Sequence, residues 1–261
     1  MRPCGEGETC DAVVSLTSYG PRIRTCHIAI RSILSQSVVP KTIILWLDAK
    51  SDDVELPAEL EELRGYGLQI NYGCDNLYGH KKYYYAMKQY PDDCIVTIDD
   101  DVIYAKDMLA TLWCIHTKYP EAVVARRAHK IMVKDNRVMP YIKWIHEYRG
   151  KTNEPLNSLM ATGVGGVLYP AHFANGLLLD KDKIIKYSLR ADDIWLKAYE
   201  AHEGIKTVVC PGEKHPFQIP GTLTDGLSSE PTEFGKNNDE VLHQLMKEFG
   251  LGAQSFSDVK G

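Results

Sequence analysis

The sequence lacks the patterns that identify several common protein classes. No apolar run approaches the roughly 20 residues that a membrane-spanning helix needs, and residues 1–10 contain no apolar signal-peptide region. The phosphate-binding patterns G-x-G-x-x-G and G-x-x-x-x-G-K-S/T are both absent, which disfavours dinucleotide-binding and P-loop proteins. We therefore predict a soluble cytoplasmic protein that makes at most peripheral contact with the inner face of a membrane.

Paired cysteines and an excess of positive charge are also missing. The seven cysteines are odd in number and scattered, and no C-x-x-C pair indicates zinc, so we expect reduced thiols. The net charge is -5 and the pI is near 6.0, which argues against a nucleic-acid binder that works by neutralising phosphates. Any phosphate that this protein recognises is therefore recognised locally.

What the sequence does contain is an alternation of strand and helix patterns. At 261 residues and 44% hydrophobic, the chain can bury a full core, and we expect a single domain over 1–261. The first half alternates strand and helix four times, which predicts an α/β fold with a doubly wound, mostly parallel sheet. The expected strands are 12–17, 41–48, 68–72 and 95–98, and the expected helices are 26–36, 56–64, 81–90 and 106–118.

The second half has a different pattern. Short strands are expected at 122–125 and 206–210, with a helix over 189–203 between them. The segment 162–170 is glycine-rich within a strand pattern, which is typical of a backbone that approaches a ligand closely. Residues 216–238 are rich in Pro, Gly, Ser and Thr and predict a mobile lid, followed by a C-terminal helix over 239–250.

The most informative stretch runs from Cys94 to Val102 and reads C-I-V-T-I-D-D-D-V. A buried strand followed at once by Asp99, Asp100 and Asp101 needs a counter-charge, because neighbouring carboxylates resist ionising together. Ligands of open α/β sheets bind at the carboxyl ends of the strands. A Mg²⁺ or Mn²⁺ ion that bridges to substrate phosphates would supply that charge. The alternative is a solvated acidic turn that caps the next helix.

Two further charged clusters can each be interpreted as part of a binding site or as an ordinary structural feature. Lys81 and Lys82 begin a predicted helix, where they would help to bind a diphosphate, although most lysines are solvated surface charges. Asp192 and Asp193 begin the helix A-D-D-I-W-L, where a simple N-cap is the structural alternative.

Together, these segments resemble a known enzyme family. V-V-S-L-T-S-Y, then S-I-L-S-Q-S-V-V-P, K-T-I-I-L-W-L-D, I-V-T-I-D-D-D-V and A-D-D-I-W-L follow one another in the order seen in nucleotide-sugar-dependent glycosyltransferases. The resemblance is to A-type, family 2-like enzymes that build bacterial surface polysaccharides, and it covers residues 12 to 210. It implies a Rossmann-like, mostly parallel central sheet flanked by helices, with a small second sheet in the C-terminal half. It also implies a nucleotide-binding half over 12–104 and an acceptor-binding half over 105–215.

The resemblance assigns expected roles to individual residues. It implies donor contacts from Thr17, Ser18, Tyr19, Arg24 (or Arg22), Asp48, Asp99 and Asp100, to which the helix-start argument above adds Lys81 and Lys82. It implies Mn²⁺ or Mg²⁺ at the Asp-x-Asp pair Asp99 and Asp101, with His215 completing the shell. The family's Glu-Asp element falls on Asp192 and Asp193, so that Asp193, with Asp192 second, would be the general base. The segment Gly163 to Gly166 would line the sugar pocket, with Trp144 and Trp195 as candidate stacking surfaces.

The predicted function is therefore a metal-dependent transfer of a sugar from a nucleotide-sugar, with UDP-sugars favoured. The acceptor would be a hydroxyl of a glycan or a lipid-linked saccharide. A single base on the acceptor side goes with inversion, and nothing in the sequence excludes retention. One competing interpretation is a sugar-nucleotide nucleotidyltransferase, for which S-Y-G-P-R-I-R is a poor phosphate loop. The other is a nucleotide- or carbohydrate-binding module without turnover.

Overall fold

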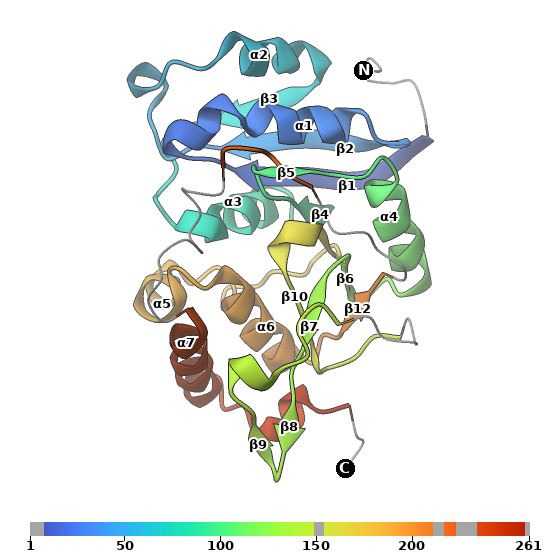
Figure 1. Cartoon of the computed structure of the whole chain (residues 1–261), viewed down its shortest axis with the longest axis vertical. Coiled ribbons are helices and arrows are strands. Elements are labelled where there is room, and N and C mark those ends of the chain that lie inside the picture. The colour runs from blue at the N-terminus through green and yellow to red at the C-terminus, as the bar shows by residue number, and fades with distance from the viewer. Residues whose placement is uncertain (1–7, 149–153, 211–216, 223–233, 259–261) are drawn as a thin grey trace.

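The computed structural model describes residues 8–148, 154–210, 217–222 and 234–258. Its centre is a seven-stranded sheet with the strand order β12-β6-β11-β4-β1-β2-β3, and helices lie on both faces (Figure 1). The strands of this sheet are β1 (Glu8–Thr17), β2 (Val38–Trp46), β3 (Leu68–Asn71), β4 (Cys94–Thr97), β6 (Val123–Ala125), β11 (Val167–Tyr169) and β12 (Thr207–Val209).

The central sheet is mostly parallel, as expected. Strand β1 pairs in parallel with both β2 and β4, β2 with β3, and β12 with β6. Strand β11 is the exception, because it runs antiparallel to β4 and β6. The glycine-rich segment 162–170, expected within a strand pattern, begins just after β10 (Leu159–Ala161) and consists of a 3-10 turn at Gly163–Gly165 followed by β11.

Alternate residues of the strands enter two hydrophobic cores, one on each face of the sheet. Val14 and Val96 face the core formed with α1 (Cys26–Leu34), α2 (Ala58–Glu61) and α4 (Met108–Lys118). Val13 and Ile95 face the core formed with α3 (Lys81–Gln89), α6 (Asp192–Glu203) and α7 (Phe234–Glu248). Both faces are covered, which explains why the central strands are apolar throughout rather than alternating.

Short paired strands complete the molecule. β7 (Ala128–Lys130) pairs with β10, β5 (Val102–Ile103) with β13 (Phe217–Gln218), and β8 (Val133–Lys134) with β9 (Arg137–Val138). The β7–β10 pair confirms the expected small second sheet in the C-terminal half. The short helix α5 (Lys181–Lys183) continues into a π-helical turn at Ile184–Ser188.

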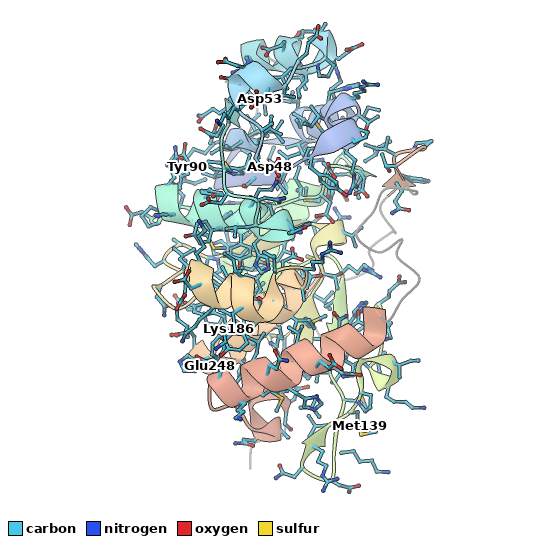
Figure 2. All side chains as sticks on the ribbon, turned by 90° about the vertical axis from the view of Figure 1, so that its left-hand side faces the viewer. Asp48, Asp53, Tyr90, Met139, Lys186 and Glu248 are labelled. Atoms are coloured by element: carbon cyan, nitrogen blue, oxygen red, sulfur yellow. The ribbon has the colours of Figure 1, made fainter. Side chains whose placement is uncertain are left out.

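Some boundaries differ from the sequence expectation. β2 begins at Val38 and includes Pro40, which lies beside an irregularity in the β1–β2 register, where a missing N–H is tolerated. α7 begins at Phe234 and packs on α6. Glu248 at its end accepts from Lys183 and from Tyr187 of the preceding π-helical turn; Glu248 and Lys186 are labelled in Figure 2.

None of the described helices is both long enough and apolar enough to cross a membrane. Of the expected lid over 216–238, only 217–222 and 234–238 are among the described residues.

A cleft lined by two acidic motifs

One cleft of about 780 Å³ lies at the carboxyl ends of β1, β2 and β4, facing the start of α6. Because these three strands are parallel neighbours, the residues that follow them emerge at one edge of the sheet. Both acidic motifs of the sequence line this cleft, although they are far apart along the chain. The lining residues include Thr17, Tyr19, Arg22, Asp48, Lys81, Lys82, Asp99, Asp100, Asp101, Gly163, Asp192 and Asp193.

The three acids after β4 form a tight turn that is anchored from the β1 side. Asp100 is 5% exposed, accepts a 2.5 Å hydrogen bond from the Ser18 hydroxyl and lies 3.1 Å from the Arg22 guanidinium. Arg22 also contacts the carboxylate of Asp101. Burial raises the pKa of Asp100 to about 6, although Arg22 lowers it in part. These acids do not cap α4, whose N-cap residue is Asp107, so the solvated-cap interpretation is wrong.

Lys81 and Lys82 are buried rather than solvated, at 1% and 7% exposure. The Lys81 ammonium lies 3.1 Å from the Asp48 carboxylate, which follows β2; Asp48 is labelled in Figure 2. The Lys82 ammonium lies 3.0 Å from Asp99 and 3.1 Å from Asp192. Burial lowers the pKa of Lys82, but Asp192 and Asp99 outweigh it, so the pKa lies well above the ordinary lysine value. Lys82 is therefore a permanent cation in the cleft.

Asp192 and Asp193 occupy the first turn of α6 without capping it by a side-chain hydrogen bond. Burial would raise the pKa of Asp192, but Lys82 and His80 bring it below the ordinary carboxylate value. Asp193 accepts a 3.3 Å hydrogen bond from the Gly163 N–H. Burial and the neighbouring charge of Asp192 raise the pKa of Asp193 to about 8. Near neutral pH, Asp193 therefore holds a proton and Asp192 does not.

Most of the expected site residues meet in this cleft. Ser18 is fully buried behind the cleft wall and reaches it through Asp100. Arg24 is exposed and does not line the cleft, and it is Arg22 that reaches the acids. His215 lies outside the described residues.

The two tryptophans are not stacking surfaces. Trp195 is 0% exposed, with its indole N–H donating to the Leu178 carbonyl, and Trp144 is 5% exposed, donating to the Met139 carbonyl. Both belong to the hydrophobic core, where a large ring contributes its full apolar surface.

Sequence reasoning missed the wall of the cleft opposite the strands. These residues come from loops and short strands whose patterns carry no motif, so tertiary contacts alone gather them. They are Asn76, Tyr78, Gly79, Arg127, His129, Tyr141, Glu147, Arg190, Phe217 and Gln218. The one available signal was the cluster of aromatic residues around Tyr141, which the sequence pattern left without a function.

The side chains of the cleft can be tested for whether they suit a divalent cation. Seven acidic and five basic side chains line the cleft, so acidic groups are in excess. No three acidic, histidine or cysteine side chains within the described ranges form a metal cage. Mg²⁺ is commonly held by one or two carboxylates together with substrate phosphates. Asp99 and Asp101 are of the right type for that kind of site, and in the structure each contacts a cation of the protein, Lys82 at Asp99 and Arg22 at Asp101.

Comparison with known proteins identifies the fold. No protein-family model matches the chain, and no curated protein has a detectably similar sequence. Crystal structures of S. aureus TarS do match. Residues 1–349 of TarS superpose with a TM-score of 0.54 at 14% identity, covering 91% of this chain and 71% of that one. The chain has the fold of TarS.

Two further TarS structures carry ligands. The same fragment in complex with UDP-GlcNAc matches with a TM-score of 0.55 and 13% identity, covering 96% of this chain and 68% of that one. Its complex with UDP matches with a TM-score of 0.51 and 13% identity, covering 93% and 72%. The TarS fold confirms the architecture that the motif order predicted for this chain.

Proposed function

We propose that this protein is a glycosyltransferase that moves a sugar from a nucleotide-sugar donor, with UDP-sugars as the donor class, to a hydroxyl group. The observation that carries the proposal is the meeting of two acidic motifs, Asp99–Asp101 and Asp192–Asp193, in one cleft of about 780 Å³. The TarS fold supports it, because TarS structures hold UDP and UDP-GlcNAc. A cleft of this size accommodates a nucleotide-sugar.

The nucleotide would lie along the carboxyl ends of β1 and β2. Thr17, Tyr19 and Asp48 line this part of the cleft and offer hydroxyl and carboxylate groups to a base and a ribose. Lys81 pairs with Asp48 and so supplies a buried positive charge at the same end. These residues bind and orient the donor in the proposal.

The sugar would lie in the cleft against the wall that Asp99, Gly163 and the start of α6 form around Lys82. In the transfer step, the acceptor hydroxyl oxygen attacks the anomeric carbon, and the bond from that carbon to the diphosphate oxygen breaks with its electron pair. The hydroxyl proton passes to a carboxylate, and we assign this role to Asp193, whose raised pKa suits proton uptake near neutral pH. A base on the acceptor side goes with inversion at the anomeric carbon.

We further propose Mn²⁺ or Mg²⁺ as the cofactor, held by Asp99 and Asp101. When bound, such an ion acts as a Lewis acid that stabilises the charge of the leaving diphosphate. The acceptor in the proposal is a hydroxyl of a glycan or a lipid-linked saccharide, and the polar side chains of Tyr141, Arg127 and Glu147, which also line the cleft, could bind it.

The test measures both binding and turnover. We expect UDP to raise the melting temperature more with Mn²⁺ than with EDTA, since a ligand that binds the native state stabilises it. We expect release of UDP from UDP-GlcNAc or another UDP-sugar, measured by chromatography, with water as the slow acceptor. An equal UDP shift in EDTA would show that Asp99 and Asp101 do not act through a metal.

Asp193→Asn separates a transferase from a binding module. We expect turnover to fall by about 10²–10⁴-fold, the usual contribution of a positioned general base. UDP should shift the melting temperature of this variant as it does that of the wild type. Unchanged turnover in Asp193→Asn would refute the assignment of the base.

A further inference from the structure

Lys82 joins the two acidic motifs physically. Its ammonium lies 3.0 Å from the Asp99 carboxylate, which follows a strand of the nucleotide-binding half, and 3.1 Å from the Asp192 carboxylate, which begins α6. The side chain is 8% exposed, so water screens these contacts weakly. A buried cation between two carboxylates from distant segments holds those segments at a set separation.

Two glycines make room for this bridge. A Cβ at Gly163 would lie 2.5 Å from the Lys82 ammonium and 3.3 Å from the Asp99 carboxylate. A Cβ at Gly79 would lie 2.7 Å from the Asp192 carboxylate. Any larger residue at either position would displace a member of the bridge. The backbone on both sides is therefore shaped around Lys82 and Asp192.

Because of this bridge, Asp192 and Asp193 have different partners. Asp192 receives the ammonium of Lys82, whereas Asp193 accepts the Gly163 N–H and has no ion-pair contact with Lys82. The charged or titratable groups that influence Asp193 are Asp192, Lys82 and Asp99, together with the phenols of Tyr141 and Tyr169. Lys82 is the cation of that set, so it governs how readily Asp193 ionises.

We propose that Lys82 is a positioning residue that holds Asp192 as a fixed anion and thereby leaves Asp193 as the single proton acceptor of the cleft. This role rests on the proposed transferase function and adds to it, because the residue order A-D-D alone leaves either acid open as the base. It also differs from a simple phosphate contact, since the ammonium of Lys82 is engaged by two carboxylates of the protein itself.

Lys81 offers a matched control. It is the neighbouring lysine, is also buried and carries the same charge, but it pairs with Asp48, which follows β2. Lys81→Met should therefore weaken donor binding and raise KM. Lys82→Met should instead lower kcat and change its pH dependence.

The experiment compares Lys82→Met, Asp192→Asn and the double variant in UDP release from a UDP-sugar. We expect kcat of Lys82→Met to fall by about a hundredfold, the lower end of a general base's contribution. We expect its acidic pH limb to move up by about one unit, because a nearby cation is lost. In the double variant, the charge and its partner leave together, so the pH limb should return towards that of the wild type.

An unshifted pH limb in Lys82→Met, or strictly additive effects in the double variant, would overturn the proposal. A readout independent of turnover is the urea midpoint of the same variants, which should be non-additive if the two groups are paired. If the wild type neither binds UDP nor releases it from UDP-sugars, the transferase function fails. In that case, additive effects of Lys82→Met and Asp192→Asn on the urea midpoint would still refute the bridge, and non-additive effects would support it.

Discussion

The cleft contains two acidic clusters that are alike in sequence but differ in how their charges are balanced. Asp100 and Asp101 share one guanidinium, that of Arg22, which emerges from the loop after β1. Asp192 has the Lys82 ammonium, whereas Asp193 has the Gly163 N–H. In the first cluster, two acids share one cation. In the second, one acid is paired with a cation, and the other accepts only a backbone N–H and has a raised pKa. The comparison shows that partners, rather than residue type, separate an anchoring acid from a proton acceptor.

Removing the guanidinium from the first cluster should have the largest effect on stability. Arg22→Met would leave Asp100 buried without its cation, and breaking a buried pair in this way costs about 3–5 kcal/mol. The loss should be greatest above the pKa of Asp100, which is about 6, because a carboxyl with a raised native pKa loses stability as pH rises through that value. Urea denaturation at pH 5 and pH 8 measures the loss of stability and its dependence on pH.

The double variant Arg22→Met/Asp100→Asn is the control for that comparison. It removes the guanidinium together with the more buried of its two carboxylate partners and leaves Asp101, so it should recover part of the stability lost in Arg22→Met. A single variant as stable as the wild type at pH 8 would mean that Arg22 does not balance Asp100.

The raised pKa of Asp193 in the second cluster predicts how turnover depends on pH. Asp193 must be deprotonated to accept a proton, and its pKa of about 8 lies far above the ordinary range. The pH dependence of kcat/KM reports the pKa of the essential base in the free enzyme. Below pH 8, kcat/KM should therefore fall by about tenfold for each pH unit. A pH profile of UDP release measures it. An acidic limb near pH 4 would show instead that Asp193 is an ordinary, ionised carboxylate.

The smallest effect is expected from the neighbouring arginine. Arg24 is exposed and lies outside the cleft lining, so Arg24→Ala should change stability by no more than about 0.5 kcal/mol. UDP affinity, measured by thermal shift, should stay within the error of the wild type. Strong loss of UDP binding in this variant would restore the donor role that the motif order assigned to Arg24.

Much of the fold could be predicted because its signals are local. The strand and helix periods of 12–118 and the acids directly after β4 are visible in the sequence, and parallel strands bring such acids to one edge of the sheet. The direction of β11 could not be predicted. It depends on the turn at Gly163–Gly165, and residues of β11 fit a buried strand in either direction.

The sequence by itself determined which residue types the site contains and that Asp99–Asp101 and Asp192–Asp193 belong to one family-like order. Only the tertiary structure decided which of them are paired. The sequence leaves Lys82 open as a diphosphate contact or a surface charge, and folding buries it between Asp99 and Asp192. Arg22 becomes distinguishable from Arg24 by its burial and its contacts with acids of the cleft. The reason is physical: the strength of a charge depends on its distance to partners and on the exclusion of water, and both are properties of the folded chain.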